Sequence, residues 1–272
     1  MASTDAATAG RPLVTVITPT RGRPEAVRAA IISVCSQTVP DVEHLVFGDD
    51  CPSLAQPDVI AVLRRDFPFV RIANVPSGPP TLSYRPARTA RIRNLGIRRA
   101  RGTFIAHLDD DNTLEPDHLA TLVACLRANP GAIAAHSWRQ LLTRKGGPFI
   151  PGPLNPWIAD PTESAANYAD LADSGVFRPG SNIMRDRLTG RAGQEFFLVD
   201  VSELLVRADF HRAHLFPTEF SAAEISSGLC EDRAWCIGVA RAGYQIARSE
   251  RATLRYFMGG YSNGQAARED TP

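Results

Sequence analysis

The stretch Thr103-Phe-Ile-Ala-His-Leu-Asp-Asp-Asp-Asn112 decides the fold, because an apolar run ends abruptly in three consecutive carboxylates. Residues 103–108 have the length and composition of a buried strand. Ligands of open parallel sheets bind beyond the carboxyl ends of the strands. A strand that ends in an acidic turn therefore predicts a binding site at that edge of a sheet.

The sequence around this stretch alternates between strand-like and helix-like segments over the first 138 residues. Such alternation predicts βαβ units and an α/β fold, with a Rossmann-like, mostly parallel central sheet flanked by helices. Polar groups follow three of the predicted strands: Thr18 to Arg21, Asp49-Asp50, and the acidic turn. The strands are predicted at 13–18 (stopped by Pro19), 44–47, 69–73, 103–108 and 132–138, with helices starting at Pro24, at 58–65, at 87–101 and after Pro116.

The second half of the chain is less regular. Residues 143–162 are rich in Gly and Pro, and a long irregular stretch in a compact domain is usually a functional loop or lid. Beyond it we expect a strand at 203–206, a polar loop at 218–228 and a helix that opens with Glu231-Asp232 and ends at Gly243.

Composition excludes several classes of protein. The 272 residues are 44% hydrophobic, and 30 basic against 29 acidic residues give a net charge of +1, so we expect no nucleic-acid partner. Five Cys without a CxxC pair argue against a disulfide framework or a zinc ribbon. No apolar run reaches about 18 residues, so we expect no transmembrane segment and a cytoplasmic location. A homodimer is compatible with this sequence.

The acidic turn offers oxygen ligands for a cation. Along an extended segment Asp109 and Asp111 point the same way and Asp110 points opposite, toward the protein. Carboxylate oxygens suit Mg²⁺ or Mn²⁺, which commonly bridge one or two carboxylates to substrate phosphates. The alternative is a solvated acidic turn that caps the following helix.

Arginines near the acidic turn could neutralise a diphosphate beside such a metal. Arg91 and Arg93 precede the turn, and Arg21 and Arg23 follow the first strand. No G-x-G-x-x-G or G-x-x-x-x-G-K-[ST] motif is present, which argues against a dinucleotide dehydrogenase and a P-loop NTPase. We expect the remaining arginines of this region only to solvate the outer face of their helix: Arg98, Arg99 and Arg101.

Seven segments in a fixed order carry a family resemblance. They are Val14-Thr-Val-Ile-Thr-Pro-Thr20, Val46-Phe-Gly-Asp-Asp50, Ala90-Arg-Ile-Arg-Asn-Leu-Gly96, Phe104-Ile-Ala-His-Leu-Asp-Asp-Asp111, Leu204-Leu-Val-Arg-Ala-Asp-Phe210, Glu231-Asp232 and Arg241-Ala-Gly-Tyr-Gln-Ile246. With these segments the chain resembles the inverting family 2 glycosyltransferases of the GT-A fold over residues 13–256. The resemblance implies one GT-A domain with a nucleotide-sugar-binding half at 12–113 and an acceptor-binding half at 114–262. We expect a disordered tail at 1–11 and a C-terminal tail at 263–272.

The resemblance also implies a metal-dependent hexosyltransferase. Its donor would be a UDP-, GDP- or dTDP-sugar, and its acceptor a small molecule, such as a natural-product intermediate, or a surface glycan. The acidic turn would be the DXD motif, with Asp111 and Asp109 toward Mn²⁺ or Mg²⁺, and Asp232 would be the general base. The implied donor-nucleotide residues are Pro19, Thr20, Arg21, Asp49, Arg93, Asp109 and Asp110.

Three further residues are candidates on the sugar and acceptor side. Trp157 could stack on a sugar ring, and Asp200 could accept a hydrogen bond from a donor sugar hydroxyl. Glu231 is either part of the acceptor site or, with Asp232, an acidic first helical turn.

The chain departs from the family pattern at two points. Cys51 stands where a glycine usually follows the second strand's paired Asp, and Arg255-Tyr-Phe-Met-Gly-Gly260 lacks the His that many members carry there. His107 and His136 are candidate substitutes for that ligand, although such residues more often belong to the core. Two alternatives stay open: a sugar nucleotidyltransferase, disfavoured because the first loop lacks the Gly-rich, Pro-Lys pattern, and a catalytically silent nucleotide-sugar-binding scaffold.

Overall fold

The computed structural model describes residues 10–76, 78, 83–188 and 199–260. The predicted tail at 263–272 lies outside these residues, as does the predicted tail at 1–11 except for Gly10 and Arg11. Arg11 Nε donates a hydrogen bond to the Arg101 carbonyl at 2.8 Å. Among the described residues, every helix is too short or too polar to span a bilayer.

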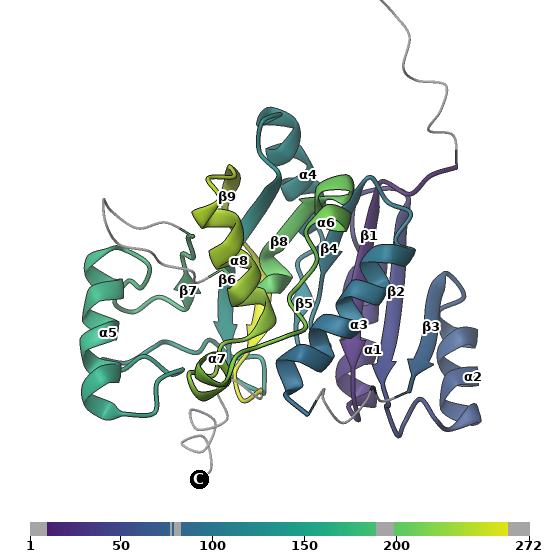
Figure 1. Ribbon diagram of the computed structural model, residues 1–272, viewed down its shortest axis with the longest axis horizontal. Coiled ribbons are helices and arrows are strands. Elements are labelled where there is room, and N and C mark those ends of the chain that lie inside the picture. Colours follow the sequence, from purple (N-terminus) through teal and green to yellow (C-terminus); the bar gives the residue numbers. More distant parts are fainter. Residues whose placement is uncertain (1–9, 77, 79–82, 189–198, 261–272) are drawn as a thin grey trace, which may run out of the picture.

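One mixed sheet forms the centre of the described chain, with strand order β3-β2-β1-β4-β8-β6-β9-β5 and β7 paired to β6 (Figure 1). Strands β3, β2, β1 and β4 are parallel, and β6 runs parallel to β9. Strand β8 is antiparallel to both β4 and β6. The sheet is thus mostly parallel, as predicted. The strands are β1 (Val14–Thr20), β2 (Val42–Asp49), β3 (Val70–Val75), β4 (Phe104–His107), β5 (Thr113–Leu114), β6 (Ala134–Leu142), β7 (Ile183–Met184), β8 (Leu204–Arg207) and β9 (Ile246–Phe257).

Helices cover both faces of the sheet because alternate residues of each strand point to opposite sides. Val14 and Val16 of β1 belong to a core cluster with α1 and α4, whereas Ile17 packs in a second cluster with α3, α6 and α8. Figure 1 shows α3 and α8 crossing the near face. The helices are α1 (Pro24–Cys35), α2 (Pro57–Asp66), α3 (Arg85–Arg99), α4 (His118–Ala128), α5 (Pro161–Asp173), α6 (Ala208–Ala213), α7 (Ala222–Ser226) and α8 (Glu231–Arg241), with a 3₁₀ turn, η3, at Val201–Glu203.

The sequence predictions missed helices α5, α6 and α7, and two of these begin with a recognisable cap. Helix α5 begins at the end of the predicted 143–162 loop, where Asp160 Oδ1 accepts a hydrogen bond from Glu163 N at 2.8 Å. Helix α7 lies inside the predicted polar loop at 218–228, where Ser221 and Glu224 form a capping box. Both starts carry the cap-x-x-Glu pattern that marks a helix N-terminus, so this signal was present in the sequence.

The end of the first strand was also predicted too early. Strand β1 continues through Pro19 to Thr20. Its ladder with β4 ends at the Ile17–His107 pair, so at Pro19 only β2 pairs with β1. Proline has no backbone N–H to donate, and a strand tolerates this where one of its sides is unpaired.

A close approach between helix α3 and strand β1 yields a stability prediction. A Cβ added at Gly96 would lie 2.6 Å from Cγ2 of the fully buried Ile17. We expect Gly96→Ala to lower the free energy of unfolding by about 1–3 kcal/mol, because a packed core does not absorb the added methyl group. Chemical denaturation measures this change.

Gly238 in α8 is the matched control, since a Cβ there would meet no atom within 4 Å. We expect Gly238→Ala to raise the free energy of unfolding by about 0.5–1 kcal/mol, because alanine loses less backbone entropy than glycine in a helix. Shifts of the same sign in the two variants would contradict the packing argument.

Candidate active site

A cleft of about 390 Å³ lies at the carboxyl ends of β1, β2 and β4 and at the start of α8. We call it the strand-end cleft; the arrowheads of β1 and β2, which mark the carboxyl ends of these strands, point to the lower edge of Figure 1. Of the residues predicted from sequence for the site, all but Trp157 line it: Pro19, Thr20, Arg21, Asp49, Arg93, Asp109, Asp110, Asp111, Asp200, Glu231 and Asp232.

The three carboxylates of the acidic turn differ in burial, as the alternation of side-chain directions predicted. Asp110 is buried, and its Oδ2 accepts a hydrogen bond from Thr20 Oγ1 at 2.7 Å. Burial raises the pKa of Asp110 to about 6, against the opposing effects of Arg23 and of the Thr20 hydrogen bond. Asp109 and Asp111 are less buried and meet the cleft with arginines. Asp110 therefore fixes the turn to strand β1 while its neighbours face the ligand space.

Arg23 neutralises the far end of the turn. Its Nη1 lies 3.2 Å from Asp110 Oδ1 and donates a short hydrogen bond to Asp111 Oδ2. Burial raises the pKa of Asp111, and the charge of Asp109 raises it further. A cation bound between these two carboxylates would relieve that repulsion.

Arg93 joins the acidic turn to helix α8. Its guanidinium is 2% exposed, and it donates from Nη2 to Asp109 Oδ1 at 2.5 Å and from Nε to Glu231 Oε1 at 3.2 Å. Asp109 and Glu231 are 122 positions apart in the sequence, so this residue couples two distant segments of the site. Arg91, the other candidate on this helix, instead donates to the Pro76 carbonyl at 3.1 Å.

The end of β2 carries a second ion-paired acid. Asp49 accepts a short hydrogen bond from Arg88 and lies 3.6 Å from Arg21 Nη1. Sequence reasoning missed Arg88, Arg85 and Thr89, which also line the cleft. The signal was available for two of them, because residues 89 and 85 lie one and two helical turns before Arg93 on the same face.

The first turn of α8 brings two acids to the cleft in different environments. Asp232 is partly exposed, and its Oδ1 accepts a hydrogen bond from Arg233 N at 2.7 Å. Glu231 is buried; burial raises its pKa to about 8, the charge of Asp232 adds to the rise and Arg93 opposes it. Asp232 is thus the more accessible carboxylate, and Glu231 lies behind it against Arg93.

The remaining predicted residues lie around strand β9. Asp200 lines the cleft, whereas Trp157 packs edge-on against Tyr256 with ring centroids 6.1 Å apart. Tyr256 itself lines the cleft and was missed, although it belongs to the segment in which a His was sought. A Cβ at Gly260 would lie 2.9 Å from Asp111 Oδ2, so the end of this segment touches the acidic turn.

The two histidines considered as substitute ligands lie in the core. His107 is buried, and its Nε2 is 2.8 Å from His211 Nε2. His136 is buried as well, with Nδ1 2.8 Å from the Ser137 carbonyl. Burial lowers the pKa of His136 to about 4, so it is neutral at physiological pH. Both histidines therefore belong to the protein core, where a histidine beside a strand is found more often than in a ligand site.

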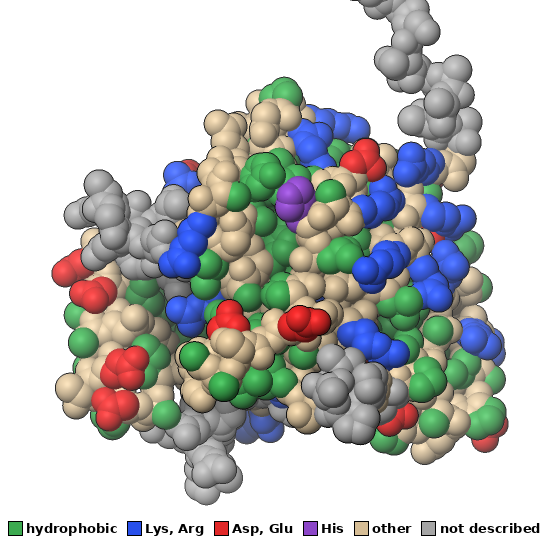
Figure 2. Space-filling model, viewed as in Figure 1, with side chains coloured by type: hydrophobic (Ala, Val, Ile, Leu, Met, Phe, Trp, Pro, Cys, Tyr) green, Lys and Arg blue, Asp and Glu red, His purple; other side chains and the backbone are tan. Residues whose placement is uncertain are grey.

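Arg98 and Arg99 are exposed at the end of α3, as expected. Arg101 is exposed as well but lies beyond the helix, and its Nε donates a hydrogen bond to Glu43 Oε1 at 2.8 Å. Figure 2 shows a group of basic side chains over the end of α3 and α6. At the end of β2, Cys51 accepts a hydrogen bond from Gly22 N at 3.2 Å and donates from its backbone N to Asn74 at 2.9 Å. The residue that replaces the family glycine therefore holds the first strand-end loop.

The residues of the acidic turn fit a divalent metal that also binds a ligand. Among the described residues, no group of three or more His, Cys, Asp and Glu side chains is arranged to hold a metal alone. Asp109 and Asp111 are hard oxygen donors at the cleft wall, and Mg²⁺ commonly uses one or two carboxylates together with substrate phosphates. The donor set suits a cation that is completed by a diphosphate.

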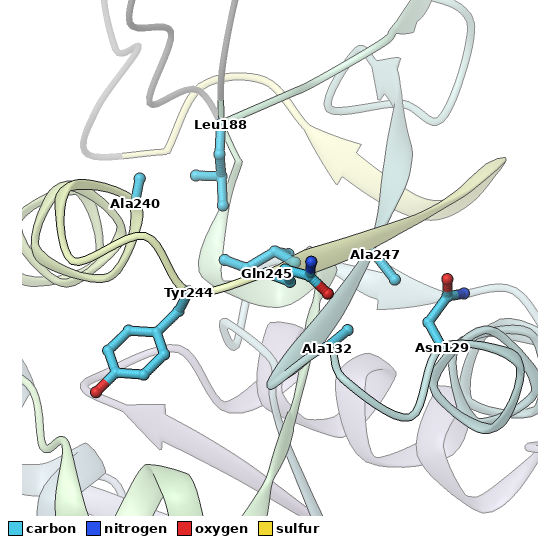
Figure 3. A pocket seen from close by; sticks show the side chains of 8 residues that line it. Asn129, Ala132, Leu188, Ala240, Tyr244, Gln245 and Ala247 are labelled. Atoms are coloured by element: carbon cyan, nitrogen blue, oxygen red, sulfur yellow. The ribbon is translucent and has the colours of Figure 1, made fainter.

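Two other hollows lie outside this cleft. One of about 870 Å³ adjoins it across Arg23 and Asp111, with apolar walls from α1 and the end of β9. The other, of about 400 Å³, lies between the end of α4 and the start of β9 (Figure 3). Its described lining holds no carboxylate, guanidinium or His. The larger hollow is lined by two acids and two arginines, Glu25, Asp111, Arg23 and Arg144. The strand-end cleft, with seven acids and five arginines, is the most highly charged of these three hollows in the described chain.

Comparisons with known proteins bear on the family and the fold of the chain. The family model for glycosyl transferase family 2 matches residues 15–141. The O-antigen biosynthesis protein RfbC of Myxococcus xanthus is 25% identical over 245 residues, which is 88% of this chain and 18% of that protein. The GalNAc(5)-diNAcBac-PP-undecaprenol beta-1,3-glucosyltransferase of Campylobacter jejuni is 26% identical over 248 residues, 89% of this chain and 68% of that protein.

Solved structures share the fold at low sequence identity. Residues 1–349 of S. aureus TarS in complex with UDP superimpose with a TM-score of 0.58 and 14% identity, covering 90% of this chain and 60% of that one. The mannosyltransferase PcManGT from Pyrobaculum calidifontis, in complex with GDP-Man and Mn²⁺, gives 0.56 and 17%, covering 94% and 60%. These matches establish a mostly parallel α/β sheet of GT-A type.

The buried carboxyl of Glu231 yields a pH prediction. Its pKa is about 8 in the folded protein and 4.5 ordinarily. Between these values the folded protein holds a proton that the unfolded chain has released, so this group makes the free energy of unfolding fall as pH rises, by up to about 1.4 kcal/mol per pH unit. We expect the stability of Glu231→Gln relative to wild type to increase from pH 5 to pH 8 in denaturation curves.

The exposed Glu224 is the control for this titration. Hydrogen bonds from the backbone and hydroxyl of Ser221 lower its pKa, so the group stays ionised from pH 5 to pH 8 in both states. The stability of Glu224→Gln relative to wild type should therefore be constant over that range. A constant difference for Glu231→Gln as well would show that the Glu231 pKa is ordinary.

Proposed function

Because the chain belongs to glycosyl transferase family 2, we propose that it transfers a hexosyl group, with inversion, from a nucleotide-diphosphate sugar to an acceptor hydroxyl, with Mn²⁺ or Mg²⁺ as cofactor. One observation carries this proposal: a single cleft contains the Asp109–Asp111 turn, Arg93 and Asp232. These residues supply a metal site, a cation for a diphosphate and a base, which an inverting transfer needs.

The nucleoside would bind at the ends of β1 and β2. Pro19, Thr20 and Arg21 form one wall there, and Asp49 with Arg88 forms the other. A pocket for a base and ribose combines flat apolar surface with a few fixed polar groups. The ion pairs of Asp49 hold such groups in place before the ligand arrives.

The diphosphate would bind beside the acidic turn. The described lining of the cleft carries seven carboxyl groups and five guanidinium groups, so the arginines leave no positive excess for a diphosphate that enters without a cation. A divalent cation held by Asp109 and Asp111 would neutralise the diphosphate as it departs. Arg93 and Arg23 supply fixed positive charge on either side of that position.

Asp232 would act as the general base. Inversion by direct displacement requires a carboxylate on the side of the sugar opposite the leaving diphosphate, within reach of the acceptor hydroxyl. Asp232 meets the cleft from the first turn of α8. Glu231 and Arg93 fix the first turn of that helix to the acidic turn.

The donor would be a UDP-, GDP- or dTDP-sugar. For the acceptor we propose a surface glycan rather than a natural-product intermediate. The support comes from the names of two relatives. One is an O-antigen biosynthesis protein, and the other is a GalNAc(5)-diNAcBac-PP-undecaprenol beta-1,3-glucosyltransferase.

Thermal unfolding with nucleotides tests the proposal. The protein is melted with UDP, GDP, dTDP, CDP or ADP, each with Mn²⁺, Mg²⁺ or EDTA. We expect one nucleotide to stabilise the protein only with metal; a ligand at about 100 times its Kd adds roughly 2.7 kcal/mol. Turnover that releases pyrophosphate would indicate a nucleotidyltransferase, and binding without turnover a scaffold.

Asp111→Asn tests the metal assignment. We expect at least a tenfold weaker affinity for the stabilising nucleotide in Mn²⁺, because an amide is a poorer ligand than a carboxylate for a hard cation. Asp66→Asn is the control, since Asp66 also pairs with an arginine, Arg28, but on the edge helix α2. Unchanged affinity of the Asp111 variant, measured by calorimetry, would exclude Asp111 as a ligand.

Asp232→Asn tests the base. We expect donor affinity within about twofold of wild type and a kcat lower by about 10²–10⁴, the usual contribution of a general base. Asp209→Asn is the control, because Asp209 lies in the first turn of another helix and its side chain is fully exposed. If the Asp232 variant keeps near wild-type kcat in a nucleotide-release assay, another residue is the base.

A further inference from the structure

A buried arginine with three surrounding carboxyl groups has no part in the steps above. Arg139 of β6 is 6% exposed, and its Nε lies 2.9 Å from Asp186 Oδ2 while its Nη1 lies 3.2 Å from Asp200 Oδ2. Glu203, fully buried, adds the third carboxyl. Buried ionic groups are expensive and contribute little to stability compared with apolar packing. Their presence next to the cleft therefore calls for a functional explanation.

Asp200 is the carboxylate of this group that lines the strand-end cleft. Its Oδ1 accepts a hydrogen bond from Ser202 N at 2.9 Å, and its Oδ2 accepts one from Arg139. Ser202 in turn accepts a hydrogen bond at Oγ from Asp109 N at 3.1 Å. The turn that carries Asp200 is thereby attached directly to the acidic turn.

Asp200 lies near both ends of the reaction path. It lines the strand-end cleft together with Asp109 and Asp232, and Ser202 links it to Asp109. In a direct displacement the transferred sugar lies between the leaving diphosphate and the base. A carboxylate that shares the cleft with Asp109 and Asp232 can therefore face the sugar.

Arg139 is held rigidly behind this carboxylate. Its Cζ lies 4.9 Å from the ring centroid of Tyr256 and 5.2 Å from that of Trp157. Guanidinium groups stack on aromatic faces and donate hydrogen bonds in a fixed planar fork. The direction of the Arg139 fork therefore sets the direction of the Asp200 oxygens. Trp157 packs against Arg139 and Tyr256 without being among the residues that line the cleft.

We propose that Arg139 is a positioning residue that aims the Asp200 carboxylate at the hydroxyl groups of the transferred sugar, so that this pair determines which sugar is accepted. A carboxylate has about four acceptor positions, and the two bonds from Ser202 and Arg139 leave room for donors from a sugar. A sugar without a hydroxyl at that place leaves a buried charge unpaired, which sites of this kind reject strongly. The inference rests on the proposed function.

The test measures recognition of the sugar separately from binding of the nucleotide. We titrate two kinds of ligand in Mn²⁺: the stabilising nucleoside diphosphate and its sugar derivatives. The derivatives are UDP-glucose and UDP-N-acetylglucosamine, GDP-mannose or dTDP-glucose. The proteins are wild type, Asp200→Asn, Arg139→Met, Arg139→Lys and the Asp200→Asn/Arg139→Met double variant. Donor KM and kcat are measured alongside by nucleotide release. We expect affinity for the free diphosphate within twofold of wild type. Affinity for the sugar donor, or kcat/KM, should fall by about 10- to 100-fold in Asp200→Asn and Arg139→Met.

The double variant and the lysine variant test the mode of action. If Arg139 acts through Asp200, the double variant loses no more than either single variant, because the two changes remove one interaction. Arg139→Lys should recover part of the loss, since it restores charge without the fork. Losses that multiply in the double variant would overturn the positioning role. Donor affinity unchanged in Asp200→Asn would overturn the sugar contact.

Glu43→Gln controls for destabilisation alone. Glu43 is a buried carboxylate bonded to Thr15 and Arg101 outside the cleft, so its change should lower the melting temperature without altering donor KM. An equal loss of donor affinity in that variant would show that the Arg139 effects are structural. If wild type binds no nucleoside diphosphate, the proposed function fails. If wild type binds the diphosphate, but the Asp200 and Arg139 variants bind the sugar donors as tightly as wild type does, only this inference fails.

Discussion

The site depends on one buried guanidinium, that of Arg93. It lies at 2.5 Å from Asp109 and 3.2 Å from Glu231, and it is 2% exposed. A charge in such a place is stable only with partners on both sides. Strand β4 must therefore end, and helix α8 must begin, where their carboxylates meet this residue. The relative placement of the acidic turn and Asp232 follows from that constraint.

The same rule governs other arginines of the cleft. Arg23 pairs with the acidic turn and Arg88 pairs with Asp49, and behind the lining Arg139 pairs with Asp200. These pairs keep the side chains in place before a ligand binds, which lowers the ordering cost of binding. They also mean that a cation or a diphosphate must exchange partners with residues already in contact. The cleft is thus organised in advance and its charges are nearly balanced.

Strand β9 ties the second half of the chain to the first. It pairs with β6 and with the short strand β5 that follows the acidic turn, and its last residues bring Tyr256 and Gly260 to the cleft. Asn112 accepts a hydrogen bond from Phe257 N at 3.1 Å, which fixes the end of β9 to the turn. The walls attributed to donor and acceptor halves therefore belong to one continuous sheet.

Much of the fold and most of the site residues could be predicted from the sequence. Apolar runs of β-branched residues, each followed by polar residues, determine buried parallel strands with a site at their carboxyl edge, and alternation along the strand determines which of Asp109, Asp110 and Asp111 faces inward. Helices α5 and α7 carried capping signals that were overlooked. The sequence could not predict which distant charges would pair. Arg93 with Glu231, Arg139 with Asp200, and Tyr256 beside the cleft are contacts across more than 60 positions. Only the tertiary structure decided them, because a buried charge takes whichever partner the packing of strands and helices brings within hydrogen-bond distance, and no local pattern encodes that choice.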